Sequence, residues 1–154
     1  MNRAEVLVQQ LGPARLLCYG MSQSAPDSPH ALVVDNDFLI RMGAVDILEQ
    51  AGFQVLDADH GDAAYELLRT RHPEVVLLFT DVQMPGKLDG FALARKVAVS
   101  WPHISLVVAS GHARPGPGSL PEKARFIAKP FSAELVHAHV REILPHGQKP
   151  EPLR

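Results

Sequence analysis

The sequence predicts an α/β fold with a doubly wound, parallel sheet of five strands and helices on both faces. Two observations lead to this prediction. Short apolar runs rich in β-branched residues recur along the chain, and single segments with helical spacing separate most of them. Strands joined through single helices form right-handed crossovers, which place the strands parallel and the helices on both faces of the sheet.

The first half of the predicted domain follows this alternation. Residues 31–34 form a continuous apolar run, which is typical of a strand buried on both faces. A helix is expected over residues 38–51, where apolar residues recur at helical spacing and Gly52 supplies a natural stop. A second strand over residues 53–58 and a second helix over residues 63–71 complete this half.

The second half contains three strands and two helices. Residues 75–79 give the strongest buried-strand pattern of the chain, and a third helix is expected over residues 91–101. The fourth and fifth strands are expected at residues 104–109 and 125–128. The last helix begins after Ser132, because a serine side chain can accept a hydrogen bond from the first free amides of a helix.

The segment between the fourth and fifth strands does not favour a helix. Residues 114–121 contain three prolines and two glycines, so we expect the fourth helix of the fold to be reduced or irregular. Residues 1–29 indicate an N-terminal extension or linker, in which Met21 is an alternative start. Residues 30–144 form the predicted domain, and residues 145–154, which are polar and rich in proline, are expected to be a flexible tail.

Composition limits the class of protein. The chain has 154 residues, a hydrophobic fraction of 46% and a net charge of −2, which fits one globular domain without a broad basic surface. The single cysteine, Cys18, excludes an internal disulfide framework and fits a reducing compartment. No apolar run is long enough to span a bilayer. We therefore expect a cytoplasmic protein with no direct nucleic-acid binding and no membrane insertion.

The residues that can carry chemistry come directly after strands. Asp35-Asn36-Asp37 follow the first strand, Thr80-Asp81 the third, Ser110-Gly111 the fourth and Lys129-Pro130 the fifth. Since sites in doubly wound sheets lie outside the carboxyl ends of the strands, one edge should gather three carboxylates, an amide, a hydroxyl and an ammonium. Oxygen ligands without Cys or His favour Mg²⁺. A carboxylate in such a cluster can act as a nucleophile and form an aspartyl phosphate.

Four segments make the chain similar to a known family. Residues 30–144, about three quarters of the chain, resemble the receiver domain of response regulators. This resemblance implies a flavodoxin-like three-layer sandwich with strand order 2-1-3-4-5. The segments that carry it are Leu32-Val33-Val34-Asp35-Asn36-Asp37, Leu78-Phe79-Thr80-Asp81-Val82-Gln83-Met84-Pro85-Gly86 with Asp89-Gly90 shortly after, Val107-Val108-Ala109-Ser110-Gly111 and Phe126-Ile127-Ala128-Lys129-Pro130-Phe131.

The resemblance implies a role for each residue that matches the family's site. Asp81 matches the aspartate that accepts a phosphoryl group from a histidine kinase or a histidine phosphotransfer protein. The Lys129–Pro130 peptide bond matches one that is cis in the family. The remaining implied roles are Mg²⁺ coordination by Asp35, Asn36, Asp81 and the backbone carbonyl of Gln83, pairing with the phosphate by Lys129, and switching by Ser110 and Phe126.

We therefore expect a phosphorylation-activated switch of a two-component phosphorelay rather than an enzyme. No second folded domain is expected after Leu144, so the output should be contact with a downstream protein, from a monomer or weak dimer, unless the domain acts as a phosphate relay or sink. The family usually has an acid where this chain has Asn36, and the loss of one negative charge should weaken Mg²⁺ binding.

Two other functions fit parts of the pattern. The substitution at Asn36 is compatible with a pseudo-receiver, a binding module that keeps the fold and is not phosphorylated. Asp35-Asn36-Asp37 also fits the Asp-x-Asp motif of haloacid-dehalogenase-like phosphatases, in which Ser110 and Lys129 would take the hydroxyl and lysine positions. The acidic pair that such phosphatases carry on a later strand is missing, and Asp81 would have no central role.

Overall fold

The computed structural model describes residues 28–154, so the expectations for residues 1–27 lie outside the described part. Five parallel strands form one sheet in the order β2-β1-β3-β4-β5. This arrangement confirms the predicted fold class and strand order. The strands are β1 (His30–Val34), β2 (Gln54–Ala58), β3 (Val75–Asp81), β4 (Ser105–Ser110) and β5 (Arg125–Ala128).

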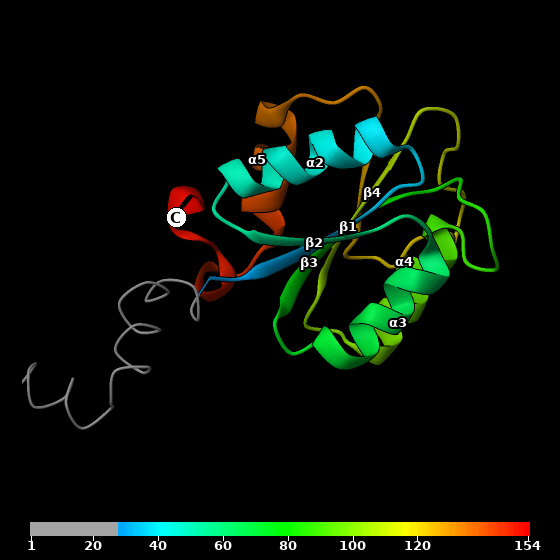
Figure 1. Ribbon diagram of the computed structural model, residues 1–154, viewed down its shortest axis with the longest axis horizontal. Coiled ribbons are helices and arrows are strands. Elements are labelled where there is room, and N and C mark those ends of the chain that lie inside the picture. The colour runs from blue at the N-terminus through cyan, green and yellow to red at the C-terminus, as the bar shows by residue number, and fades with distance from the viewer. Residues whose placement is uncertain (1–27) are drawn as a thin grey trace, which may run out of the picture.

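Four helices cover the two faces of the sheet and complete three layers. In Figure 1, α2 and α5 lie on one face and α3 and α4 lie on the other. Each helix except α3 has a side-chain N-cap, from Asp37, Asp89 and Ser132, which explains where these helices begin. The helices are α2 (Phe38–Gln50), α3 (Gly61–Arg71), α4 (Gly90–Ser100) and α5 (Ala133–Ile143).

Two apolar clusters, one on each side of the sheet, form the core. Along β1, Ala31 and Val33 face the cluster under α2 and α5, whereas Leu32 and Val34 face the cluster under α3 and α4. All four side chains are fully buried. A strand that is covered on both faces needs apolar residues at every position, which is why its sequence does not alternate.

The described chain between β4 and β5 contains no helix, as the prolines and glycines of this segment predicted. Ala113, Leu120 and Ala124 instead pack against the cluster beneath α3 and α4, and so does Phe126 of β5. The guanidinium of Arg95 on α4 donates to the carbonyl of Ser119 at 2.8 Å. A loop thus covers the part of the sheet where the family has its fourth helix.

The structure differs from the expectation for residues 145–154. This segment forms two short 3₁₀ turns, η2 (His146–Gln148) and η3 (Glu151–Leu153), and Leu153 is buried with 2% exposure in the core beneath α2 and α5. A side chain at Gly52, where φ is +105°, would collide with Pro150 and Pro152. The single leucine and the prolines therefore dock this segment on the turn after α2, although its composition indicated flexibility.

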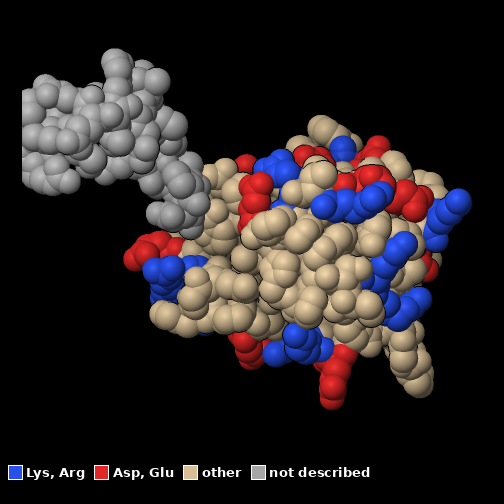
Figure 2. Space-filling view, turned by 90° about the horizontal axis from the view of Figure 1, so that it is seen from below, with Lys and Arg blue, Asp and Glu red and all other residues tan. Residues whose placement is uncertain are grey.

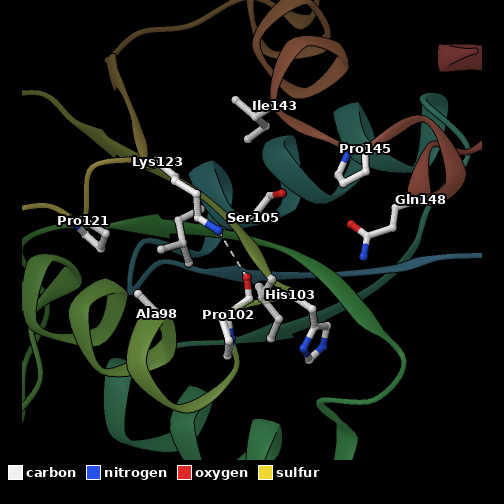
Figure 3. Close-up of a pocket in the computed structure, with 11 residues that line it drawn as sticks. Ala98, Pro102, His103, Ser105, Pro121, Lys123, Ile143, Pro145 and Gln148 are labelled. Atoms are coloured by element: carbon white, nitrogen blue, oxygen red, sulfur yellow. Dashed lines mark hydrogen bonds between the residues drawn. The ribbon is translucent and has the colours of Figure 1, made fainter.

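A cavity of about 290 Å³ lies near the amino end of β4, away from the carboxyl ends of the strands (Figure 3). It lies between the ends of α4 and α5 and the turn η2, and the ammonium of Lys123 on its rim donates to the carbonyl of Pro102 at 3.5 Å. Seen from below, charged residues of both signs lie around the margin of the molecule (Figure 2). Within residues 28–154, no helix has the length and apolar character needed to cross a membrane.

We predict rapid hydrogen exchange in the loop between β4 and β5. The amides of Arg114, Gly116 and Gly118 are expected to exchange far faster than those of β4, because this stretch has a local turn between Gly116 and Ser119 in place of helical hydrogen bonds. Amide exchange followed by mass spectrometry or NMR provides the measurement, with Val107 and Val108 as the internal reference. Strong protection throughout residues 114–121 would contradict the absence of a helix.

Candidate functional site

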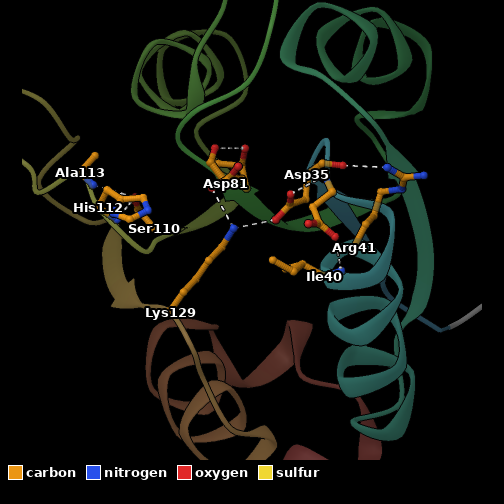
Figure 4. A network of polar contacts seen from close by, with 10 residues as sticks. Asp35, Ile40, Arg41, Asp81, Ser110, His112, Ala113 and Lys129 are labelled. Atoms are coloured by element: carbon orange, nitrogen blue, oxygen red, sulfur yellow. Dashed lines mark hydrogen bonds and ion pairs between the residues drawn. The ribbon is translucent and has the colours of Figure 1, made fainter.

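The carboxyl ends of the strands bring the predicted residues together. Asp35 follows β1, Asp81 ends β3, Ser110 ends β4 and Lys129 follows β5. These four side chains line one open hollow of about 390 Å³, shown in Figure 4. Asn36 and Gln83 line the same hollow and are exposed to solvent. The structure therefore gathers at one edge the acidic, amide, hydroxyl and ammonium groups that the sequence placed at separate strand ends.

The ammonium of Lys129 joins the two buried acids of the site. Its Nζ donates to Oδ2 of Asp35 and to Oδ1 of Asp81, each at 2.9 Å. The side chain of Lys129 is 15% exposed, and those of Asp35 and Asp81 are 5% and 10% exposed. Two carboxylates and one ammonium leave a net charge of −1 in a poorly hydrated position, which favours the approach of a further cation.

The pKa values of Asp81 and Lys129 are both raised, but for different reasons. Burial raises the pKa of Asp81, and the nearby charge of Asp35 acts in the same direction, against the hydrogen bond from Lys129. For Lys129, burial lowers the pKa, but the hydrogen bonds to Asp35 and Asp81 outweigh it, so that the pKa is raised overall. Lys129 therefore stays protonated at neutral pH, whereas ionisation of Asp81 is energetically unfavourable in its buried position.

Several hydrogen bonds hold Asp35 in place. Its Oδ1 accepts from the amide of Asp37 at 2.9 Å, while its own amide donates to the carbonyl of Ala58 at 3.2 Å. The guanidinium of Arg41 donates to the backbone carbonyl of Asp35 at 2.8 Å. These contacts join the end of β1 to the end of β2 and to the first turn of α2.

The backbone around Asp81 is also held closely. The hydroxyl of Thr80 donates to the carbonyl of Asp81 at 2.9 Å. The amide of Gly90 donates to the carbonyl of Val82 at 2.8 Å, and a side chain at Gly90 would collide with the backbone of Asp81. Glycine is therefore required where α4 begins, because the helix approaches the phosphoacceptor candidate too closely for any side chain.

Ser110 is turned towards its own loop. Its Oγ accepts from the amides of His112 at 3.2 Å and Ala113 at 3.0 Å, so the hydroxyl caps the turn after β4 (Figure 4). Phe126 is partly buried, and the guanidinium carbon of Arg114 lies 5.6 Å from the centre of its ring. The Lys129–Pro130 peptide bond is cis, as the resemblance implied.

The donor set at this edge suits a hard cation. Within residues 28–154, no group of three or more His, Cys, Asp and Glu side chains lies close enough to hold a metal. The carboxylates of Asp35 and Asp81 nevertheless share the hollow with the side-chain amide of Asn36 and with Gln83, whose backbone carbonyl the resemblance implies as a ligand. Oxygen donors with a net negative charge are what Mg²⁺ prefers.

Comparison with known proteins identifies the family. Residues 31–141 match the family described as the response regulator receiver domain. The chain belongs to the response-regulator receiver family. Receiver domains act in two-component signalling, where histidine kinases are their partners, and they bind Mg²⁺ for phosphorylation.

Two relatives from Brucella abortus (strain 2308) show how such a domain occurs. The chain is 32% identical over 121 residues to the response regulator receiver protein CpdR, covering 77% of this chain and 92% of CpdR. It is 33% identical over 120 residues to the sensor kinase CckA, but this match covers 76% of this chain and spans 13% of CckA. Receivers similar to this one therefore occur both alone and inside a larger kinase.

Solved structures agree with the fold. A response regulator receiver protein from Sinorhizobium medicae WSM419 superposes with a TM-score of 0.70 at 22% identity, covering 79% of this chain and 98% of that one. The receiver domain of the hybrid histidine kinase CckA superposes with a TM-score of 0.65 at 25% identity, covering 75% of this chain and 99% of that one.

Sequence reasoning assigned no role to two residues that shape the receiver site. Arg41 was missed, and it donates to the backbone carbonyl of Asp35. Gly90 belongs to a pair that supports the family resemblance, and the structure adds that it allows α4 to approach Asp81. The pair Asp89-Gly90 was the available signal, since an N-cap followed by glycine at the first helical position indicates a close approach of the helix end.

We predict that Asp81→Asn raises the melting temperature at neutral pH. Asparagine keeps the size of the side chain and an acceptor for Lys129, and it removes a charge that burial disfavours. Because the pKa of Asp81 is raised, the wild-type protein loses stability as the pH rises through that pKa. The gain from the substitution should therefore be largest at neutral pH and should vanish only below the ordinary pKa of an aspartate, where the carboxyl is protonated in both the folded and the unfolded protein.

Thermal unfolding of both proteins over a series of pH values provides this measurement. The control is Asp46→Asn, which changes the same group on the exposed side of α2, where Asp46 accepts a hydrogen bond from Gln50. An unchanged or lower melting temperature for Asp81→Asn at neutral pH would contradict the cost assigned to the buried charge.

Proposed function

We propose that this receiver is a phosphorylation-controlled signalling switch, in which Asp81 accepts a phosphoryl group from the phosphohistidine of a histidine kinase or a histidine phosphotransfer protein. The observation that carries the proposal is the bridge of Lys129 between Asp35 and Asp81. It gives a buried carboxylate with a fixed cation beside it at the mouth of an open hollow. A carboxylate nucleophile, a cation and room for three phosphoryl oxygens are the requirements of this transfer.

The transfer exchanges one bond to phosphorus for another. A carboxylate oxygen of Asp81 forms a bond to phosphorus while the bond between phosphorus and the donor's imidazole nitrogen breaks, and the electron pair remains on that nitrogen. Lys129 stands 2.9 Å from Asp81 and supplies positive charge for the developing phosphoryl oxygens. Mg²⁺, held by Asp35, Asn36, Asp81 and the backbone carbonyl of Gln83, would neutralise the remaining negative charge.

The switch is proposed to begin at Ser110. Its hydroxyl now accepts two backbone amides of the following loop, and movement onto a phosphoryl oxygen would release both of them. The loop that follows packs with Phe126 beneath α4, so a rearrangement of the loop changes the surroundings of this ring. A charge added at Asp81 would thereby alter the surface formed by the β4–β5 loop and β5, where a downstream protein could bind.

The surface beside the site suits a protein partner. Phe38 and Leu39, at the start of α2, are 61% and 78% exposed, and an apolar hollow runs from Ile40 and Ile47 to Phe131. Large apolar side chains that are exposed together mark a contact surface. Since this patch borders the hollow that holds Asp81, we propose that the phosphodonor protein docks on it.

The first test is phosphorylation by a small donor. The protein is incubated with Mg²⁺ and acetyl phosphate beside Asp81→Ala and the control Asp46→Ala, and phosphoprotein is separated and quantified. Labelling of the parent and of Asp46→Ala, but not of Asp81→Ala, is the expected result. If the parent is labelled neither by acetyl phosphate nor by a phosphorylated histidine domain, the pseudo-receiver is favoured; turnover of a phosphate ester that needs Asp35 and not Asp81 would favour a phosphatase.

We predict that Asn36→Asp strengthens Mg²⁺ binding. The substitution restores a negative charge beside Asp35 on an exposed position of the hollow, where an added charge disturbs no buried contact. A decrease of several-fold in the dissociation constant for Mg²⁺ is expected, since charge count sets the affinity of oxygen sites for divalent cations. A calorimetric or NMR titration that shows equal affinity for both proteins would overturn this assignment of Asn36.

A further inference from the structure

We propose that Arg41 is a positioning residue of the metal site, which holds the turn of residues 35–37 in the geometry that Mg²⁺ requires. The inference rests on the proposed function, because it assumes that Asp35 and Asn36 hold the ion. Arg41 itself touches neither Asp81 nor Lys129 through any hydrogen bond or ion pair among the described residues. Its action passes through the backbone of Asp35.

The guanidinium makes two directed contacts with two different strand ends. Its Nη1 donates to the backbone carbonyl of Asp35 at 2.8 Å, and its Nε donates to Oδ2 of Asp57 at 2.9 Å. Asp35 follows β1, and Asp57 is the penultimate residue of β2. Figure 4 shows Arg41 reaching from α2 towards the backbone of Asp35, on the side of that residue away from Lys129. One side chain therefore ties together β1, β2 and α2 directly behind the acidic turn.

Other hydrogen bonds also restrain this turn: the amide of Asp37 donates to Oδ1 of Asp35 at 2.9 Å, and the backbone amide of Arg41 donates to the carbonyl of Asp37 at 2.9 Å. Asn36 and Asp37 are exposed, and the carboxylate of Asp37 is already engaged as the N-cap of α2 through the amide of Ile40 at 3.1 Å. The carbonyl of Asp35 belongs to the peptide group that links Asp35 to Asn36. Fixing that carbonyl limits rotation of the peptide between the two proposed ligands, which is the kind of support that orients first ligands in metal sites.

The burial of Arg41 sets it apart from an ordinary surface ion pair. Its side chain is 13% exposed and also lies over the ring of Phe38, with the guanidinium carbon 5.4 Å from the ring centre. Arg69, by contrast, pairs with Glu66 on α3 at 60% and 67% exposure. Exposed pairs of this second kind contribute little, so Arg69 offers a matched control with the same residue type.

The sign of the effect separates positioning from simple electrostatics. Arg41 is a cation near carboxylates, so removal of its charge alone should make the site more negative and tighten the binding of Mg²⁺. Loss of positioning should weaken the binding, because the proposed ligands would no longer be held in place. Substitutions of outer residues that orient metal ligands commonly weaken metal binding by about tenfold to a hundredfold.

The experiment is a titration of the unphosphorylated protein with Mg²⁺, followed by NMR of the backbone amides or by calorimetry. The variants are Arg41→Gln, Arg41→Lys and the control Arg69→Gln, and amide spectra without metal establish that each is folded. We expect Arg41→Gln to weaken Mg²⁺ binding by about tenfold and Arg69→Gln to leave it unchanged. Arg41→Lys keeps the charge but replaces the two nitrogens of a planar fork by a single ammonium nitrogen, so it should weaken binding as well.

Three results would overturn the proposal: tighter binding by Arg41→Gln, unchanged binding by Arg41→Gln, or binding by Arg41→Lys equal to that of the parent. The parent protein distinguishes these failures from failure of the proposed function. If the parent itself does not bind Mg²⁺ in the millimolar range, the assignment of the metal site is wrong, and the role of Arg41 falls with it. If the parent binds and the variants do not differ, only the role of Arg41 is wrong.

Discussion

The site depends on one ammonium held between two buried carboxylates. Lys129 lies 2.9 Å from both Asp35 and Asp81, and the three groups come from loops or ends of β1, β3 and β5. A charge cluster of this kind is costly to bury unless its members are paired. The carboxyl ends of these strands must therefore be held in fixed relative positions, since displacement of any one strand end would leave an unpaired charge.

Several neighbouring residues help to hold the strand ends in these positions. Gly90 lets α4 approach the backbone of Asp81, and the hydroxyl of Thr80 donates to the carbonyl of Asp81. Arg41 fixes the end of β1 against β2. The charge balance is nevertheless left at −1, and burial raises the pKa of Asp81. A divalent cation or a new partner for Lys129 would offset this cost, as the proposed switch requires.

Several features could be predicted from the sequence, and the reasons are physical. Buried strands need continuous apolar runs such as residues 31–34, and residues that follow parallel strands meet at one edge, so the fold and the meeting of Asp35, Asp81, Ser110 and Lys129 could be anticipated. The strand order was implied by the resemblance to receiver domains. The docking of Leu153 could not, because a single apolar residue in a polar segment shows no periodicity. Arg41 was missed because a side chain that acts on a backbone carbonyl carries no motif.

The measurement that tests the account most directly is the chemical location of the phosphoryl group. After reaction with acetyl phosphate and Mg²⁺, reduction with borohydride converts an aspartyl phosphate to homoserine, which tandem mass spectrometry locates in the sequence. We predict conversion at Asp81 alone, and far less of it when Lys129 is replaced by methionine. Conversion at Asp35 or Asp37, or none at Asp81 in a protein that binds Mg²⁺, would contradict the assignment of Asp81 as the phosphoacceptor.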